Sequence, residues 1–210
     1  MKTGRVRPMI YAHRGASAYA PENTLAAFKL ALDQGADGIE LDAKLSADGE
    51  IVVIHDQTVD RTTGNKGLVR NLTIAQLHTM DAGSWKSPIF KGEKIPTLAE
   101  VFVAVGGKMI INIELTNYQS PFDGLPEKAV DLVRKFKIED TVIFSSFLQS
   151  NLSAVRKLWP AAPMGILSLP GLSGAINRSG FSRWVSPEYS HPHFRDVTPQ
   201  LLKRETAVGR

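Results

Sequence analysis

The stretch GIELDAKLSADGEIVVIHD, residues 38–56, contains two apolar runs that alternate with ionisable residues and meet at a turn. Alternation with a period of two is typical of β-strands, and Asp48-Gly49 is a strong signal for a tight turn between them. If this dipeptide is the whole loop, Asp42 lies directly opposite His55, and Glu40 shares the face of Asp42. The sequence therefore predicts that two carboxylates and an imidazole converge on one side of a strand pair.

Outward from this hairpin, predicted strands alternate with predicted helices, which indicates an α/β fold with a parallel sheet or barrel. Thr73-x-x-Gln76 and Thr97-x-x-Glu100 are capping boxes that mark two helix starts. The other predicted helices run from Asn23 or Thr24 to Gly35 and over 126–136, 150–159 and 198–204, and the other predicted strands cover 9–12, 109–115, 141–146, 163–168 and 184–187.

The composition fits one ordinary globular domain spanning all 210 residues, with 43% hydrophobic and 22% charged residues. No cysteine is present, which excludes disulfides and thiolate zinc sites. The net charge of +4 comes from scattered lysines and arginines, a pattern that favours a solvated surface over nucleic-acid binding but still attracts an anionic substrate. No apolar run approaches the length of a transmembrane segment, so we expect a cytoplasmic protein.

The polar, glycine-rich segment 56–96 follows His55 directly and is long for a connection within a barrel. Such insertions are usually functional, so we expect a cap over the site, with Trp85, Pro88 and Phe90 as its apolar anchor. A loop that packs only on itself is the alternative.

Glu114 lies near the carboxyl end of another buried strand, the end that carries the catalytic groups in barrels. Together, Glu40, Asp42 and Glu114 would form a hard-oxygen site for a divalent metal, Mg²⁺ or Ca²⁺. Any one of these carboxylates alone could instead be the partner in a buried ion pair. His13 and His55 are suited to be a general acid and base, because imidazole titrates near neutrality.

The planar guanidinium of Arg14 can donate to two oxygens of a phosphate, although an ordinary salt bridge would also explain an arginine at this position. Asn23 is equally well explained as a helix cap or as part of a helix start that faces the phosphate. His191 and His193 have a spacing that could bind metal, but we expect them in a loop and do not predict ligation.

Several ordered motifs at compatible spacing make the chain resemble the glycerophosphodiester phosphodiesterases from about residue 9 to its end. They are His13-Arg14-Gly15, Glu22-Asn23-Thr24, Glu40-x-Asp42, His55-Asp56, the run from Asp81 to Trp85, Ile95-Pro96-Thr97-Leu98 and Ile113-Glu114.

The resemblance implies a TIM-type (β/α) barrel with an insertion after the third strand. It also implies metal-dependent hydrolysis of a small-molecule glycerophosphodiester to sn-glycerol 3-phosphate and an alcohol. By this resemblance His13 and His55 are the acid/base pair and Arg14 binds the phosphate, while Glu40, Asp42 and Glu114 hold the metal.

Two departures from the family pattern stand out. Thr116 occupies a position where the family usually has a lysine, which removes one cation near the site. The sequence also ends at Arg210, before the family's last two strand motifs, so we expect a barrel that lacks its last strands. Such a barrel would expose two sheet edges, which a homo-oligomer would cover.

Two alternatives therefore remain beside the enzyme. One is a phospholipase-like phosphodiesterase that acts on a lipid. The other is a truncated, catalytically impaired or binding-only member of the same fold.

Overall fold

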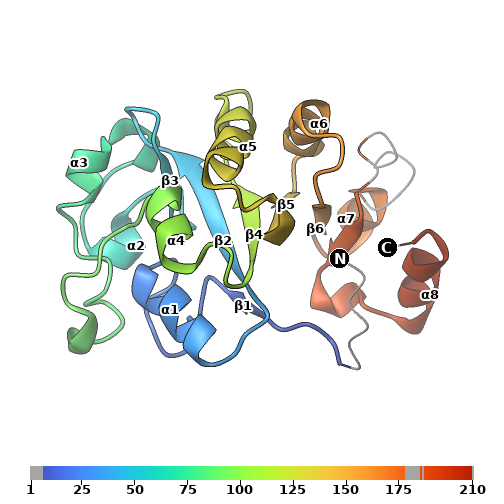
Figure 1. The fold of residues 1–210 in the computed structure, drawn as a ribbon, viewed down its shortest axis with the longest axis horizontal. Coiled ribbons are helices and arrows are strands. Elements are labelled where there is room, and N and C mark those ends of the chain that lie inside the picture. The colour runs from blue at the N-terminus through green and yellow to red at the C-terminus, as the bar shows by residue number, and fades with distance from the viewer. Residues whose placement is uncertain (1–6, 178–184, 186, 210) are drawn as a thin grey trace. The chain divides into compact units, whose positions relative to one another are not determined.

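The computed structural model describes residues 7–177, 185 and 187–209, and the chain divides into two compact units, Met1–Asn112 and Ile113–Arg210 (Figure 1). Strands and helices alternate along most of the chain, as the sequence predicted. Among the described residues, no helix is both long and apolar enough to cross a membrane.

The first unit is built on a small sheet. Its strands are β1 (Tyr11–His13), β2 (Gly38–Leu45), β3 (Ile51–Val53) and the first part of β4 (Ile110–Leu115). β1 runs parallel to β2, with His13 beside Glu40, and β3 runs antiparallel to β2. The Ile110 N–H donates to the Asp37 carbonyl at 3.1 Å, so β4 begins beside the start of β2.

The helices of the first unit are α1 (Leu25–Asp33), α2 (Asp60–Thr63), α3 (Ile74–Leu77) and α4 (Leu98–Val105), with 3₁₀ turns η1 (Val69–Asn71) and η2 (Pro88–Phe90). Three of them, α1, α3 and α4, begin at predicted capping residues, whereas α2 was not predicted and has no side-chain cap. Both predicted capping boxes, Thr73 with Gln76 and Thr97 with Glu100, are confirmed. Thr24 caps α1 through its hydroxyl, which accepts from the Ala27 N–H.

β2 is buried on both of its faces. Ile39, Leu41 and Ala43 point to one face and are fully buried. The other face carries ionisable residues that are also buried, namely Glu40, Asp42 and Lys44. α1 and α4 pack against each other in this unit (Figure 1). Because buried charges are costly unless they are paired, the ionisable face of β2 requires partners from other elements.

The predicted register of the hairpin is wrong by one residue. Ala43 pairs with Val53 and Leu45 with Ile51, so Asp42 is level with Ile54, whose N–H donates to the Asp42 carbonyl at 3.0 Å. The loop has three residues instead of two, because Ser46 bonds Glu50 at 3.0 Å and Gly49 takes a left-handed φ of 79°. His55 therefore follows β3 as a loop residue and does not face Asp42 across the hairpin.

The segment 56–96 packs a small apolar core of its own against β3. Buried residues of this core are Val52, Ile54, Val59, Val69, Leu77, Ala82 and Ile95. The predicted anchor is wrong in part: Trp85 is 41% exposed and Pro88 is exposed, while Phe90 is half-buried. The core is aliphatic, and of its buried residues only Val69 of η1 and Leu77 of α3 come from helices of this segment.

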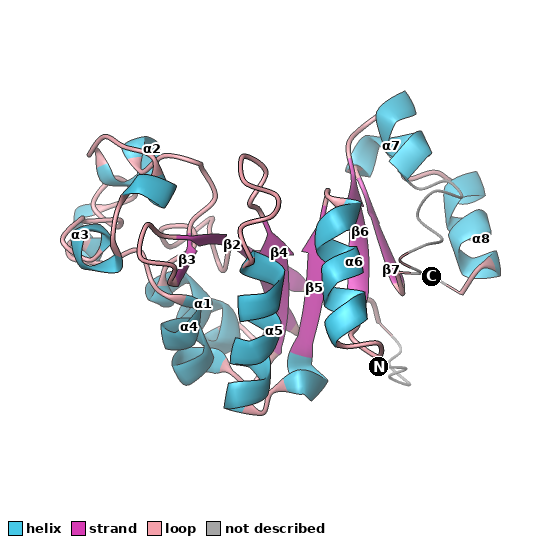
Figure 2. Cartoon of the chain, turned by 90° about the horizontal axis from the view of Figure 1, so that it is seen from above, coloured by secondary structure: helices cyan, strands magenta, loops and turns pink. Residues whose placement is uncertain are grey.

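The second unit contains the end of β4 and the strands β5 (Val142–Ser146), β6 (Met164–Ser168) and β7 (Tyr189–Pro192). β5, β6 and β7 run parallel in that order. Its helices are α5 (Leu125–Phe136), α6 (Gln149–Leu158), α7 (Leu172–Asn177) and α8 (Pro199–Ala207), with 3₁₀ turns η3 (Glu139–Thr141) and η5 (Phe194–Asp196). α5 and α6 lie side by side (Figure 2).

The structure corrects the sequence analysis near the end of this unit. Half of the predicted strand at 184–187 lies outside the described residues, its described residues 185 and 187 are not in a strand, and the last described strand is β7. His191 belongs to β7 and was wrongly expected in a loop. Its imidazole lies against Gly165 of β6, where a Cβ atom would come within 2.6 Å of the ring, and desolvation lowers the pKa of His191.

Candidate active site

The turn that follows β1 carries His13, Arg14 and Gly15. Gly15 has a φ of 79° and packs so closely on α1 that a Cβ atom there would lie 2.7 Å from Ala27, so only glycine fits. Arg14 also has a left-handed φ, 57°, which is uncommon for a residue with a side chain. This backbone turn places the Arg14 N–H 3.1 Å from the Glu40 carboxylate of β2.

The side chains of Asn23 and Asp42 are hydrogen-bonded to each other. The Asn23 amide donates to Asp42 Oδ2 at 2.8 Å, and the Asn23 N–H donates to the Arg14 carbonyl at 3.0 Å. Asn23 is 3% exposed and has a left-handed φ of 57°. Thr24, not Asn23, caps α1, so Asn23 serves to fix the carboxylate of Asp42.

A chain of ion pairs links the turn after β1 to the loop after β3. Glu22 Oε1 accepts from Arg14 Nη1 at 2.9 Å and from Arg61 Nη2 at 2.7 Å. Arg61 Nε also donates to Asp56 Oδ2 at 2.8 Å, and Asp56 Oδ1 lies 2.7 Å from Nδ1 of His55. This series of ion pairs therefore has one predicted site residue at each end, Arg14 at one and His55 at the other.

These contacts shift the titration of their carboxylates. The hydrogen bond from Arg61, assisted by His55, lowers the pKa of Asp56 to about 2. Desolvation raises the pKa of Glu22, but hydrogen bonds from Arg61 and Arg14 together outweigh it and leave that pKa lowered. Both carboxylates are therefore ionised at neutral pH.

His13 lies beside the carboxylates of β2. Its Nε2 is 3.8 Å from Glu40 Oε2. Partial desolvation, followed by the charge of Arg14, lowers the pKa of His13, while Asp42 opposes that shift and His55 adds to it. The first unit thus brings together five predicted site residues, although His55 reaches the site by a different route from the one the hairpin register predicted.

Glu114 lies on β4, in the part of that strand that belongs to the second unit. It is half-buried, and the Tyr118 hydroxyl donates a hydrogen bond to its Oε1. Thr116, at the position where the family usually has a lysine, is 2% exposed.

Sequence reasoning missed Glu22, Arg61 and Lys44 as contributors to this site. Lys44 is the third ionisable residue on the inner face of β2 and is 4% exposed. The period-two pattern that singled out Glu40 and Asp42 extends to Lys44 and could have revealed it. Arg61 has no comparable signal, because it lies in the irregular segment 56–96.

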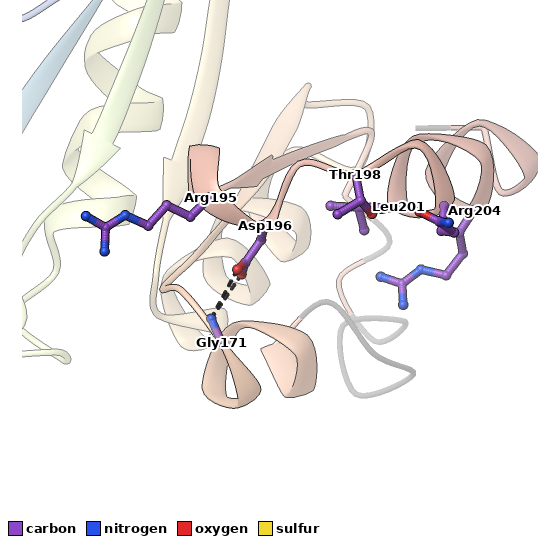
Figure 3. A pocket seen from close by; sticks show the side chains of 7 residues that line it. Gly171, Arg195, Asp196, Thr198, Leu201 and Arg204 are labelled. Carbon is purple, nitrogen blue, oxygen red and sulfur yellow. Dashed lines mark hydrogen bonds between the residues drawn. The ribbon is translucent and has the colours of Figure 1, made fainter.

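A hollow of about 410 Å³ lies in the second unit, lined by residues of η5, α8 and Gly171 (Figure 3). Asp196 accepts from the Gly171 N–H there, at 3.1 Å to Oδ2, and Arg195 and Arg204 are also part of the lining. None of the predicted site residues lines this hollow, so we do not place the chemistry there.

The turn after β1, the ionisable face of β2 and the loop after β3 carry imidazoles, carboxylates and an arginine guanidinium, a set that defines a candidate hydrolase of phosphate esters. The chain belongs to the glycerophosphoryl diester phosphodiesterase family, whose sequence model matches residues 13–204. By family it is therefore a phosphodiester hydrolase.

Named relatives and solved structures agree with this membership. The chain is 39% identical over 203 residues to a glycerophosphodiester phosphodiesterase of Caldanaerobacter subterraneus subsp. tengcongensis, covering 94% of this chain and 81% of that protein. It is similar, with a TM-score of 0.87 and 32% identity, to an Oleispira antarctica phosphodiesterase in complex with its product sn-glycerol 3-phosphate, covering 96% of this chain and 81% of the other. A glycerophosphodiester phosphodiesterase of Agrobacterium tumefaciens gives a TM-score of 0.79 at 32% identity, covering 97% and 84%.

Proposed function

We propose that this protein hydrolyses glycerophosphodiesters to sn-glycerol 3-phosphate and an alcohol, with help from a divalent metal ion. The observation that carries this proposal is the junction of β1 and β2, where His13 lies 3.8 Å from the Glu40 carboxylate and the Arg14 backbone bonds that same carboxylate at 3.1 Å. A general acid or base thus lies beside a candidate metal ligand. The name of the Caldanaerobacter relative and the product bound to the Oleispira phosphodiesterase support this substrate class.

The donor set on β2 fits a divalent cation. Glu40 and Asp42 are 9% and 1% exposed, and they present carboxylate oxygens from the same face of one strand. Hard oxygen donors of this kind suit Mg²⁺ or Ca²⁺. When bound, such a cation supplies charge neutralisation at the phosphate and activation of the attacking oxygen.

We propose Glu114 as the third carboxylate of this cation site. β4 begins beside the start of β2, where Ile110 bonds the carbonyl of Asp37 at 3.1 Å. Thr116, which follows β4, would place a neutral hydroxyl where the family usually has a lysine.

His13 and His55 then serve as the acid/base pair. One imidazole takes the proton of the attacking hydroxyl, and the other gives a proton to the leaving alkoxide. Asp56 bonds the Nδ1 of His55 at 2.7 Å, which leaves Nε2 of that ring to face the substrate. The attacking hydroxyl is either water or the 2-hydroxyl of the substrate glycerol, which would give a cyclic phosphate intermediate.

Arg14 would bind the phosphate. Glu22 holds one side of its guanidinium at 2.9 Å, and Asp42 lies 3.5 Å from its Nε. A guanidinium has five N–H donors in a planar fork, so a clamped arginine can still present a donor pair to phosphate oxygens. The two carboxylates would fix the fork before the substrate arrives.

We also propose that the segment 56–96 is a cap over this site. Lys86 donates to the Ser17 carbonyl at 2.8 Å, and Arg61 donates to Glu22 at 2.7 Å, so the segment is tied to the loop between β1 and α1. A TIM-type barrel that carries this insertion after its third strand is the fold we propose for the chain.

The test is release of glycerol 3-phosphate from glycerophosphocholine and from glycerophosphoethanolamine, measured with Mg²⁺, with Ca²⁺ and with EDTA. We expect turnover with a metal, none with EDTA, and loss of turnover in His13→Ala. The matched control is His78→Ala, because His78 lies on the far end of α3 and pairs with Glu100 at 3.5 Å. A folded wild-type chain that releases no product with either metal would contradict the proposal.

A further inference from the structure

Lys44 is a buried cation on β2 that contacts three successive backbone carbonyls. Its ammonium group donates to the carbonyls of Ile54 at 2.7 Å, His55 at 2.6 Å and Asp56 at 3.1 Å. Lys44 is 4% exposed, so water has little access to these hydrogen bonds. An ammonium has three N–H donors, and these three carbonyls match them in number.

The three carbonyls belong to the point where the chain leaves the sheet. β3 ends at Val53, whose N–H donates to the Pro96 carbonyl at 2.8 Å, and the last bond across to β2 comes from the Ile54 N–H. Beyond Ile54, the backbone carbonyls of His55 and Asp56 accept hydrogen bonds from Lys44. Lys44 therefore ties the backbone of this loop to the neighbouring strand.

The loop determines where the His55 imidazole lies. Asp56 bonds Nδ1 of His55 at 2.7 Å and is in turn bonded by Arg61 at 2.8 Å. These side chains restrain the ring about its own axis, but Lys44 restrains the backbone from which both His55 and Asp56 project. A displacement of that backbone would move the imidazole and its carboxylate together.

We propose that Lys44 is a positioning residue, which holds residues 54–56 so that His55 can transfer a proton to or from the substrate. This inference rests on the proposed function, because it concerns the geometry of the same site. Misplacing a catalytic group by about 1 Å can reduce a rate by about 100-fold. We therefore expect Lys44 to affect kcat strongly and substrate binding weakly, since Arg14 and the β2 carboxylates do not depend on its contacts.

The first test is Lys44→Met, which keeps the aliphatic shape and removes all three donors. We expect kcat to fall by about 10-fold to 100-fold with KM changed by less than about threefold. The matched control is Lys108→Met, which removes another ammonium–carbonyl bond, from Lys108 to Ala104 at 2.8 Å, on an exposed surface. That control should keep the kcat of the wild type.

Hydrogen–deuterium exchange separates positioning from general destabilisation. In Lys44→Met we expect faster amide exchange in the peptide covering residues 54–61, with the peptides of α1 and α4 unchanged. Lys44→Arg keeps the charge but has a planar fork in place of three converging donors, so it should fold and give intermediate values of kcat and of local exchange. If Lys44→Met does not fold, kcat and the amide exchange of residues 54–61 are measured on Lys44→Arg instead, and wild-type values of both would overturn the positioning role.

A wild-type kcat in Lys44→Met would overturn the inference. So would a lower kcat accompanied by faster exchange throughout the first unit, because that pattern indicates a structural role only. Failure of the proposed function has a different signature, since wild-type protein would then release no product at all. In that case, unchanged exchange over 54–61 in Lys44→Met would still overturn the inference on its own.

Discussion

Polar groups gather around the strands of both units, but they differ in kind. In the first unit, β1 and β2 carry His13, Glu40, Asp42 and Lys44. In the second unit, the ends of β5 and β6 carry only hydroxyls, those of Ser145, Ser146 and Ser168, all of them buried.

The buried polar contacts at the ends of β4 and β5 form a network of amides, hydroxyls and carbonyls. The Asn151 amide donates to the Asn117 side chain at 2.8 Å and to the Leu115 carbonyl at 3.2 Å, and the Ser146 hydroxyl donates to the same carbonyl at 2.8 Å. Neutral hydrogen bonds fix the ends of strands but supply no group that titrates near neutrality. The first unit therefore holds five of the six predicted site residues, and Glu114 lies on β4 in the second unit.

Replacement of a β2 carboxylate should have the largest effect on activity. Asp42→Asn removes a proposed metal ligand, so we expect turnover to fall to the level seen with EDTA, with weaker Mg²⁺ binding in calorimetry. Stability should stay equal or rise, because a buried carboxylate without its cation is costly.

Asp33→Asn, which changes an exposed carboxylate at the end of α1, is the control for this experiment. Full turnover in Asp42→Asn would remove the main distinction between the two units.

Removal of the imidazole of His55 should reduce kcat by about 10²-fold to 10⁴-fold, the usual contribution of general acid–base catalysis. Thermal unfolding should change little, because the His55 side chain is 43% exposed. Steady-state kinetics and a melting curve on His55→Ala measure both quantities. A large loss of stability with little loss of kcat would indicate that this histidine is structural.

A change in the network of amides, hydroxyls and carbonyls should show the opposite pattern. Asn151→Ala leaves the Asn117 side chain and the Leu115 carbonyl with fewer partners in a buried place, so the free energy of unfolding should fall by about 1–3 kcal/mol. The kcat of the folded fraction should equal that of the wild type. Urea unfolding and kinetics test this, with Ser153→Ala on the exposed side of α6 as control.

The smallest effect we predict concerns the stability of the first unit in acid. The pKa of Asp56 is lowered from 3.8 to about 2, so its ionised form stabilises the folded state above pH 3.8, and this contribution is lost as the pH falls through about 2. Asp56→Asn should therefore be less stable than the wild type at neutral pH, and the two stability curves should converge between these values. Parallel curves over that range would show that the Arg61 contact does not favour the ionised carboxylate.

Local signals in the sequence predicted most elements of the fold. The threonine capping boxes, Gly35 and the prolines fix helix ends through contacts within a few residues, and these contacts do not depend on distant parts of the chain. The hairpin register was wrong because Asp48-Gly49 was interpreted as a two-residue loop, whereas the Ser46 N–H bonds the Glu50 carbonyl around a three-residue loop with Gly49 at a left-handed φ. The Asp48 carboxylate also accepts from the Ile74 N–H at 3.0 Å, a contact from outside the hairpin.

The candidate site could be predicted as a set of residues but not as a network. Glu40 and Asp42 were found because strand periodicity places them on one face of β2, and His13 because it is an imidazole at the end of a predicted strand. The contacts of Arg61 with Glu22 span 39 residues, and no local pattern encodes them. The aliphatic core of the segment 56–96 was missed for the same reason, since its buried residues come from several short elements.

The most direct test of the account is ³¹P NMR of glycerophosphocholine incubated with the chain and Mg²⁺. If the first unit holds the proposed acid/base and cation site, the diester resonance should be replaced by that of sn-glycerol 3-phosphate, with free choline in the proton spectrum. The same sample with EDTA should keep the diester signal. Formation of phosphocholine and glycerol, or an unchanged diester with folded protein and metal, would contradict the proposed reaction.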